Sequence, residues 1–181
     1  KRPRRPELPE RPHRPRREGV DPEEDIARRN QVIEYEDYEA VLIAHVTPDG
    51  LVNYKSLKRN RAPLDRFLIS LDKLPPEQFA TFTRDQQIAF WINAYNAAVL
   101  RIIIDNYPIE AEGLSKFIYP DNSIRQIAGV FERIEFPVMG RKYSLDEIEH
   151  DVLRAQFTEP RIHMALVCAA MSCPPLRREP F

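Results

Sequence analysis

A chain of 181 residues has room for one domain and a terminal tail. Its net charge of −1 hides an asymmetry, because residues 1–18 carry eight basic and three acidic side chains, a balance of +5 that leaves −6 for the rest. A mildly acidic domain argues against a nucleic-acid surface, and no apolar run reaches the ~18 residues of a membrane span. The first residues also lack the apolar segment of a secretion signal, in a chain that does not begin with Met.

Residues 1–30 are predicted to form a disordered Pro/Arg-rich tail, and residues 31–181 a single globular domain. Prolines at positions 3, 6, 9, 12 and 15 have the three-residue repeat of a polyproline II helix. The simpler interpretation of this tail is a solvated spacer. The alternative is a ligand that contacts a protein groove or a polyanion weakly.

Apolar spacing and turn residues predict the elements of the first half. These are a helix over Glu23–His45, a turn at Thr47–Gly50, a short strand over Leu51–Tyr54, and a helix from Pro63 to Leu74. The clearest helix start in the chain follows, where Thr83 and Gln86 are predicted to form a capping box. The helix that begins there has apolar residues on every side up to Asn106, so we expect it to be buried and central.

The second half is predicted to hold shorter elements. They are a short helix at Ser123–Ile127, a hairpin over Arg133–Lys142, a helix over Leu145–Gln156 after a second capping box, and a last helix from Pro160 to Ala169. The expected fold class is therefore α+β and mainly helical. A buried central helix (about 84–106) is packed by other helices and a small antiparallel β element.

Two amides on the central helix are candidates for a binding site. Asn93 and Asn96 lie three residues apart, hence on one face, inside an otherwise apolar helix. A buried amide without partners costs about 1–3 kcal/mol, so something polar must face them. They either bind loop backbone and lock the fold or line a polar pocket.

A second group lies on the helix over Leu145–Gln156. Glu149 and His150 are followed by Arg154, and the spacing places His150 and Arg154 on one face. An exposed charged face explains these residues. The alternative is a general base at His150, because imidazole titrates near neutral pH.

The last segment holds Arg161, His163, Cys168 and Cys173 within thirteen residues. On a continuous helix the last three point apart, which argues against a metal site, and no cofactor is expected. A disulfide requires the helix to break near Ser172. Two further interpretations remain: a thiolate activated by a histidine, or buried cysteines without a chemical role.

Five segments stand in one order along the chain: Gln87–Ala97, Ser123–Arg125, Tyr143–His150, Pro160–His163 and Ser172–Leu176. Together they resemble the bacterial branch of domain-of-unknown-function family 547. The resemblance implies that the polar positions above belong to the family's motifs. This sequence departs from the family's pattern at Val167 and Ala170, where relatives often carry polar residues. An apolar environment raises the pKa of a thiol, which favours Cys173 over Cys168 as the reactive cysteine.

The resemblance also implies that the chain is a fragment, because relatives usually continue past the Cys-Pro-Pro-Leu motif. An apolar patch near the C-terminus is therefore expected. Many bacterial relatives resemble exported proteins, which implies an exported or periplasmic location.

Two functions fit this sequence. One is a Cys/His-based hydrolase or transferase with Cys173 as nucleophile, His163 or His150 as base and Glu149 orienting the base. Asn93 or Asn96 would then donate to a developing oxyanion. The other is a non-catalytic binding module in which these polar groups satisfy one another.

Overall fold

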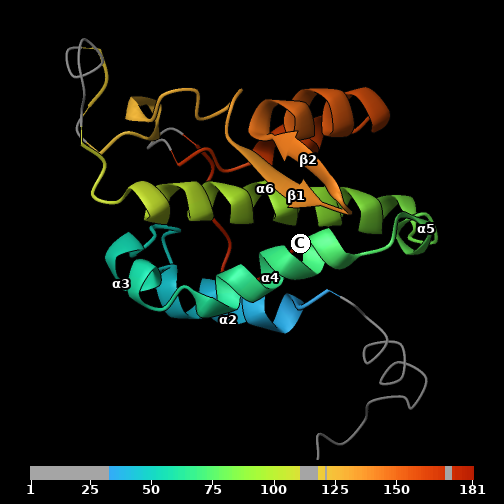
Figure 1. The fold of residues 1–181 in the computed structure, drawn as a ribbon, viewed down its shortest axis with the longest axis horizontal. Helices are drawn as coiled ribbons and strands as arrows, with labels where there is room; N and C mark the ends of the chain where they lie inside the picture. Colours follow the sequence, from blue (N-terminus) through green and yellow to red (C-terminus); the bar gives the residue numbers. More distant parts are fainter. Residues whose placement is uncertain (1–32, 111–117, 121, 170–172) are drawn as a thin grey trace, which may run out of the picture. The chain divides into compact units, whose positions relative to one another are not determined.

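The domain is organised around one long helix, α6 (Arg84–Asn106), which is buried along most of its length. The computed structural model describes residues 33–110, 118–120, 122–169 and 173–181. In the view of Figure 1 the helices of residues 35–73 lie below α6, and the hairpin of residues 135–144 with the helix of residues 147–154 lies above it. The turn of the hairpin also donates two backbone hydrogen bonds to carbonyls at the end of the helix of residues 62–73. The expected fold class, mainly helical α+β with a buried central helix, is confirmed.

The first layer consists of α2 (Tyr35–His45), α3 (Tyr54–Arg59), α4 (Ala62–Lys73) and the single turn α5 (Pro76–Phe79). The prediction for α4 is confirmed to within one residue, with Pro63 in its first turn. The predicted helix over Glu23–His45 is confirmed from Tyr35 to His45 and is wrong at Ile33 and Glu34, which precede the helix, whereas residues 23–32 lie outside the described part of the chain.

The predicted strand over Leu51–Tyr54 is wrong. Val52 makes one isolated antiparallel bridge with Val46, and Tyr54 already begins α3. Asn53 caps that helix by accepting a 3.0 Å hydrogen bond from the backbone N–H of Ser56. Four residues with three apolar side chains do not distinguish a strand from a helix start, and here the polar cap residue decides between them.

Helix α6 begins where the sequence places it. The Thr83 hydroxyl accepts from the backbone N–H of Gln86, and the Gln86 side chain accepts from the backbone N–H of Thr83 at 2.8 Å. By length and composition α6 could cross a membrane, but 83% of its apolar window is buried inside the domain. It is therefore a core helix, wrapped by the elements around it.

The second layer begins with η2 (Ile124–Gln126), a short 3₁₀ turn, followed by β1 (Glu135–Val138) and β2 (Arg141–Ser144). The two strands pair antiparallel, as the hairpin prediction requires. Ser144 and Glu147 form the second capping box, with bonds of 2.8 and 3.2 Å. The helix that this box opens is confirmed in place, but its turns over Glu147–Arg154 (η3) are π-helical.

The last predicted helix is wrong beyond its first turn. Only a 3₁₀ helix, η4 (Pro160–Met164), forms there. The Ala165 carbonyl and the Val167 N–H then hydrogen-bond to the side chain of Asn96 on α6. Those bonds replace the helical ones, and the chain continues to Phe181 without further helix among the described residues.

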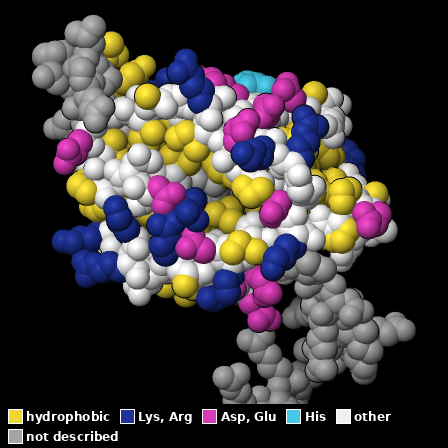
Figure 2. Space-filling view, viewed as in Figure 1, with side chains coloured by type: hydrophobic (Ala, Val, Ile, Leu, Met, Phe, Trp, Pro, Cys, Tyr) yellow, Lys and Arg dark blue, Asp and Glu magenta, His cyan; other side chains and the backbone are white. Residues whose placement is uncertain are grey.

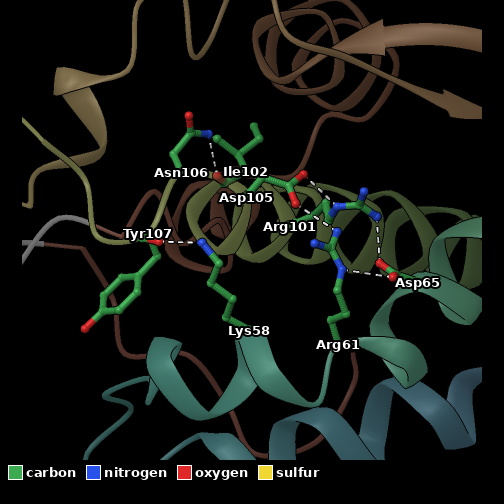
Figure 3. A network of polar contacts seen from close by, with 8 residues as sticks. All are labelled: Lys58, Arg61, Asp65, Arg101, Ile102, Asp105, Asn106 and Tyr107. Carbon is green, nitrogen blue, oxygen red and sulfur yellow. Dashed lines mark hydrogen bonds and ion pairs between the residues drawn. The ribbon is translucent and has the colours of Figure 1, made fainter.

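A ring of four alternating charges joins α4 to α6 (Figure 3). Arg61 contacts Asp65 at 3.0 Å and Asp105 at 2.8 Å, and Arg101 contacts the same two carboxylates at 2.6 and 2.7 Å. The four side chains are 32–40% exposed. Each charge therefore has two opposite neighbours in a partly solvated setting, which limits the stabilisation per pair.

We expect a double-mutant cycle on Asp65→Ala and Arg101→Ala to give a coupling energy of about 0.5–1 kcal/mol at low salt. The coupling should fall towards zero in about 1 M NaCl, because salt screens partly exposed charges. Urea unfolding of the wild type, both single variants and the double variant measures it. Coupling that does not change with salt would mean that the ring acts by packing.

Candidate functional site: the asparagine clasps and the disulfide

Asn96 clasps the polypeptide backbone with both ends of its amide. Its side chain is 2% exposed. The Nδ2 atom donates to the carbonyl oxygen of Ala165 at 3.0 Å, and the Oδ1 atom accepts from the backbone N–H of Val167 at 2.9 Å. One side chain thus satisfies a donor and an acceptor of a segment that has no secondary structure of its own.

Asn93 makes the same arrangement one turn earlier on α6. It is 1% exposed, donates from Nδ2 to the Phe181 carbonyl oxygen at 3.1 Å, and accepts from the Phe181 N–H at 3.0 Å. The two asparagines therefore fasten the C-terminal part of the chain, here called the strap (residues 165–169 and 173–181), to α6. This is the backbone-locking alternative of the two roles that the sequence left open.

The two cysteines form a disulfide inside the strap. Cys168 and Cys173 are bonded, with their Cα atoms 6.3 Å apart. The pairing is accessible because helix η4 has ended at Met164, and Ala169 has a positive φ of 59°. In this bonded state neither sulfur is a thiol, so the nucleophile prediction for Cys173 or Cys168 applies only to the reduced protein and stays a prediction.

The strap approaches the first layer closely at Gly50. Gly50 has φ of +79°, and a Cβ atom built on it would lie 2.3 Å from the Pro175 Cβ atom. The neighbouring Leu176 is 5% exposed and belongs to the hydrophobic core. The sequence assigned Gly50 a role only in the turn Thr47–Gly50. The structure shows a second role, because Pro175 can come this close only to a residue that has no Cβ atom.

Glu149, Arg154 and His163 form a cluster between η3 and η4. Arg154 Nη2 donates to Glu149 Oε1 at 2.6 Å and lies 3.1 Å from His163 Nδ1. The π-helical turn produces the first contact, because residues five apart are neighbours there, whereas an α-helix turns them away from each other. The predicted shared face of His150 and Arg154 therefore does not describe the site, and His150 is exposed to solvent.

The cluster fixes the tautomer of His163. A guanidinium only donates, so the Nδ1 atom of a neutral His163 must accept, and its proton then sits on Nε2. On the buried helix α6, burial raises the pKa of the Tyr95 hydroxyl, and the Glu149 carboxylate raises it further. The Tyr95 hydroxyl is therefore held in its neutral form, which the sequence did not indicate because an aromatic residue in a buried helix resembles ordinary core.

Arg161 belongs to neither group. Its guanidinium makes two 2.8 Å hydrogen bonds to the Glu159 carboxylate, and these hold the pKa of Glu159 at about 2. No group of three or more metal-binding side chains is found among the described residues. The predicted site residues thus divide into backbone clasps, a disulfide, a charged cluster and a surface ion pair.

A comparison with known protein families assigns the chain to one of them. Residues 79–181, more than half of the chain, match the family described as "Protein of unknown function, DUF547". The chain belongs to this family. No curated protein and no solved structure matches it. The matched part of this DUF547 domain contains α6, the charged cluster, the disulfide and the strap, whereas Gly50 and the helices α2–α4 precede it.

A groove lies beside the N-terminal half of α6 in the DUF547 domain. Its volume is about 370 Å³. The apolar lining residues are Ile88, Ala89, Ile92, Ile162, Ala165 and Phe181. Its charged lining residues are two acidic and two basic side chains, most of them exposed and here called its rim: Asp85, Glu159, Arg161 and Arg177. Basic and acidic side chains are likewise interspersed on the face drawn in Figure 2. The groove thus combines an apolar lining with a rim of no net charge.

Stability of the DUF547 domain should fall in alkaline solution because of two partly buried tyrosines, Tyr35 and Tyr54. Burial raises the pKa of Tyr35 and of Tyr54 to about 12, and a hydrogen bond with Asn93 partly offsets the effect at Tyr35. The unfolded chain ionises near pH 10, so their contribution is complete below pH 10 and is lost as the pH rises towards 12. Urea midpoints measured across this window test this. A Tyr54→Phe variant should lose less stability over the same window, and an equal loss would contradict the assignment to Tyr54.

Proposed function

We propose that this DUF547 domain is a non-catalytic binding module that receives an apolar polypeptide segment in the groove beside α6. The observation that carries the proposal is the use of Asn93 and Asn96. In both amides the nitrogen and the oxygen are hydrogen-bonded to backbone groups, at 2.9–3.1 Å, which leaves few hydrogen-bonding positions for a substrate. A catalytic site needs polar groups that remain directed at the reacting atoms.

The bonded cysteines support the same proposal. A Cys/His-based hydrolase or transferase needs a thiolate beside its base, whereas both sulfurs are in a disulfide and His163 contacts Arg154. Disulfides form and persist mainly in oxidising environments. The proposal therefore includes an exported location.

The choice of a polypeptide as ligand rests on Phe181. Its backbone N–H and carbonyl both pair with the side-chain amide of Asn93, and Phe181 also lines the groove, so the surface beside α6 already binds extended backbone. Phe181 is 37% exposed, and the centroid of its ring lies 4.7 Å from the Arg177 guanidinium carbon. Phe181 thus adds an aromatic wall to the groove, and the apolar lining on α6 fits apolar side chains of a peptide.

Binding can be tested with labelled eight-residue peptides in which apolar residues alternate with serine. Ala89 lies on the floor of the groove and is partly exposed, so we expect Ala89→Arg to weaken peptide binding at least about ten-fold. Ile69→Arg is the matched control, because Ile69 is 51% exposed on α4 and lies outside the groove lining. Fluorescence polarisation measures both variants.

Equal binding by the two variants, or no saturable binding of any apolar peptide, would refute the groove as the binding site. Turnover of a thioester or ester probe that depends on Cys173 and His163 after reduction would instead support the enzyme.

A further inference from the structure

We propose that the Cys168–Cys173 disulfide is a redox switch for the strap, which loosens from α6 when a dithiol reduces the bond. The disulfide lies between the two points where the strap is fastened. Asn96 holds residues just before it, and Asn93 holds Phe181 after it. Its state therefore sets how freely the chain moves between two fixed ends.

The sulfur-bearing residues are within reach of a reductant. Cys168 and Cys173 are both partly exposed, unlike the apolar residues Leu166 and Leu176 on either side, which are buried. A dithiol attacks one sulfur as a thiolate and forms a mixed disulfide, and its second thiol then displaces the protein sulfur. Two electrons and two protons end on the protein cysteines, and the reductant leaves as a disulfide.

Ala169 gives the oxidised strap a conformation that its sequence does not favour. Its φ of 59° lies in the left-handed region, which disfavours any residue with a Cβ atom. Ala169 directly follows Cys168 and lies inside the loop that the disulfide closes. Reduction removes the link that holds Ala169 at this φ, so Ala169 can return to an ordinary conformation, and this relief favours the reduced state.

The consequence reaches the groove, because Arg177 and Phe181 form one of its walls. Loosening the strap changes this wall and hence the binding of apolar segments. Only this last step rests on the proposed function. The switch itself concerns the strap and α6, and it can be measured without any ligand.

Hydrogen exchange on the oxidised and the reduced full chain tests the switch. The N–H groups of Val167 and Phe181 are bonded to asparagine oxygens, and we expect their exchange to become about ten- to thirty-fold faster on reduction. Amides in the middle of α6 should keep their protection. Mass spectrometry after alkylation verifies that both cysteines are reduced.

Replacing Ala169 with Gly provides a second measurement. Glycine accepts positive φ, so the equilibrium constant for disulfide formation in dithiothreitol buffers should rise several-fold, up to about five-fold. Ala155→Gly is the matched control, because Ala155 has an ordinary φ of −76° and lies outside the strap. An unchanged constant in Ala169→Gly would overturn the proposed strain at Ala169.

Unchanged exchange at Val167 and Phe181 in the verified dithiol form would overturn the switch. Loss of protection throughout α6 would also overturn it, because the disulfide would then be a structural link for the whole domain. Normal switching with no peptide binding would instead leave the switch standing and refute the proposed function.

Discussion

Replacing Asn96 with Ala should lower the free energy of unfolding by about 3 kcal/mol, because two backbone groups of the strap lose their partners together. The Ala165 carbonyl and the Val167 N–H depend on this one amide. A buried polar group left without a partner costs about 1–3 kcal/mol. Urea or thermal unfolding, followed by circular dichroism, measures the loss.

The same helix offers a matched control at Asn106. This residue is exposed, and its Nδ2 atom donates to the Ile102 carbonyl at 2.8 Å near the end of α6. Asn106→Ala should change stability by no more than about 0.5 kcal/mol. Equal effects at Asn96 and Asn106 would show that the clasp on the strap contributes nothing of its own.

A further variant, Asn96→Asp, separates the two hydrogen bonds of the clasp. The carboxylate keeps an acceptor for Val167 but presents an oxygen to the Ala165 carbonyl. We expect a loss of stability at neutral pH at least as large as that of the alanine variant. Acid should partly restore it, because a protonated carboxyl can donate again.

Replacing Gly50 with Ala should destabilise the domain by about 3 kcal/mol, from backbone strain and overlap combined. The new Cβ would lie 2.3 Å from the Pro175 Cβ and 2.8 Å from the Pro175 Cα, and backbone cannot move aside as a flexible side chain can. The strap would have to shift away from the turn at Gly50. Thermal unfolding measures the effect, and faster exchange at Phe181 would locate it.

Gly140 serves as the control for backbone strain alone. It has a similar φ of +71°, but a Cβ atom there meets nothing within 4 Å. Gly140→Ala should therefore cost only about 1 kcal/mol. If both glycine variants lose the same stability, the close approach of the strap at Gly50 has no energetic weight.

Local sequence patterns were sufficient for the elements whose stability is local. The capping boxes at Thr83 and Ser144 place the starts of α6 and of the helix containing η3, because each pairs residues three apart in the chain. The hairpin was also predictable from alternation and a glycine turn. In each case the partners that satisfy the backbone are neighbours in sequence.

The same reasoning failed where distant residues compete for the backbone. The segment after Met164 has helical spacing, but Asn96, 69 residues before Ala165, takes the bonds that a helix would need. The contact between Glu149 and Arg154 was missed as well, because it depends on π-helical turns that no local rule distinguishes from an α-helix.

The sequence by itself determined that Asn93 and Asn96 lie on one face of a buried helix and need polar partners. The apolar pattern predicts the helix. Any buried amide needs hydrogen-bond partners, because removing it from water without them costs free energy. Only the tertiary structure decided that those partners are backbone groups of the strap, that Cys168 and Cys173 lie close enough to bond, and that His163 contacts Arg154. These pairings depend on how the chain returns to α6, and that path follows from packing of the whole core rather than from residues near it in sequence.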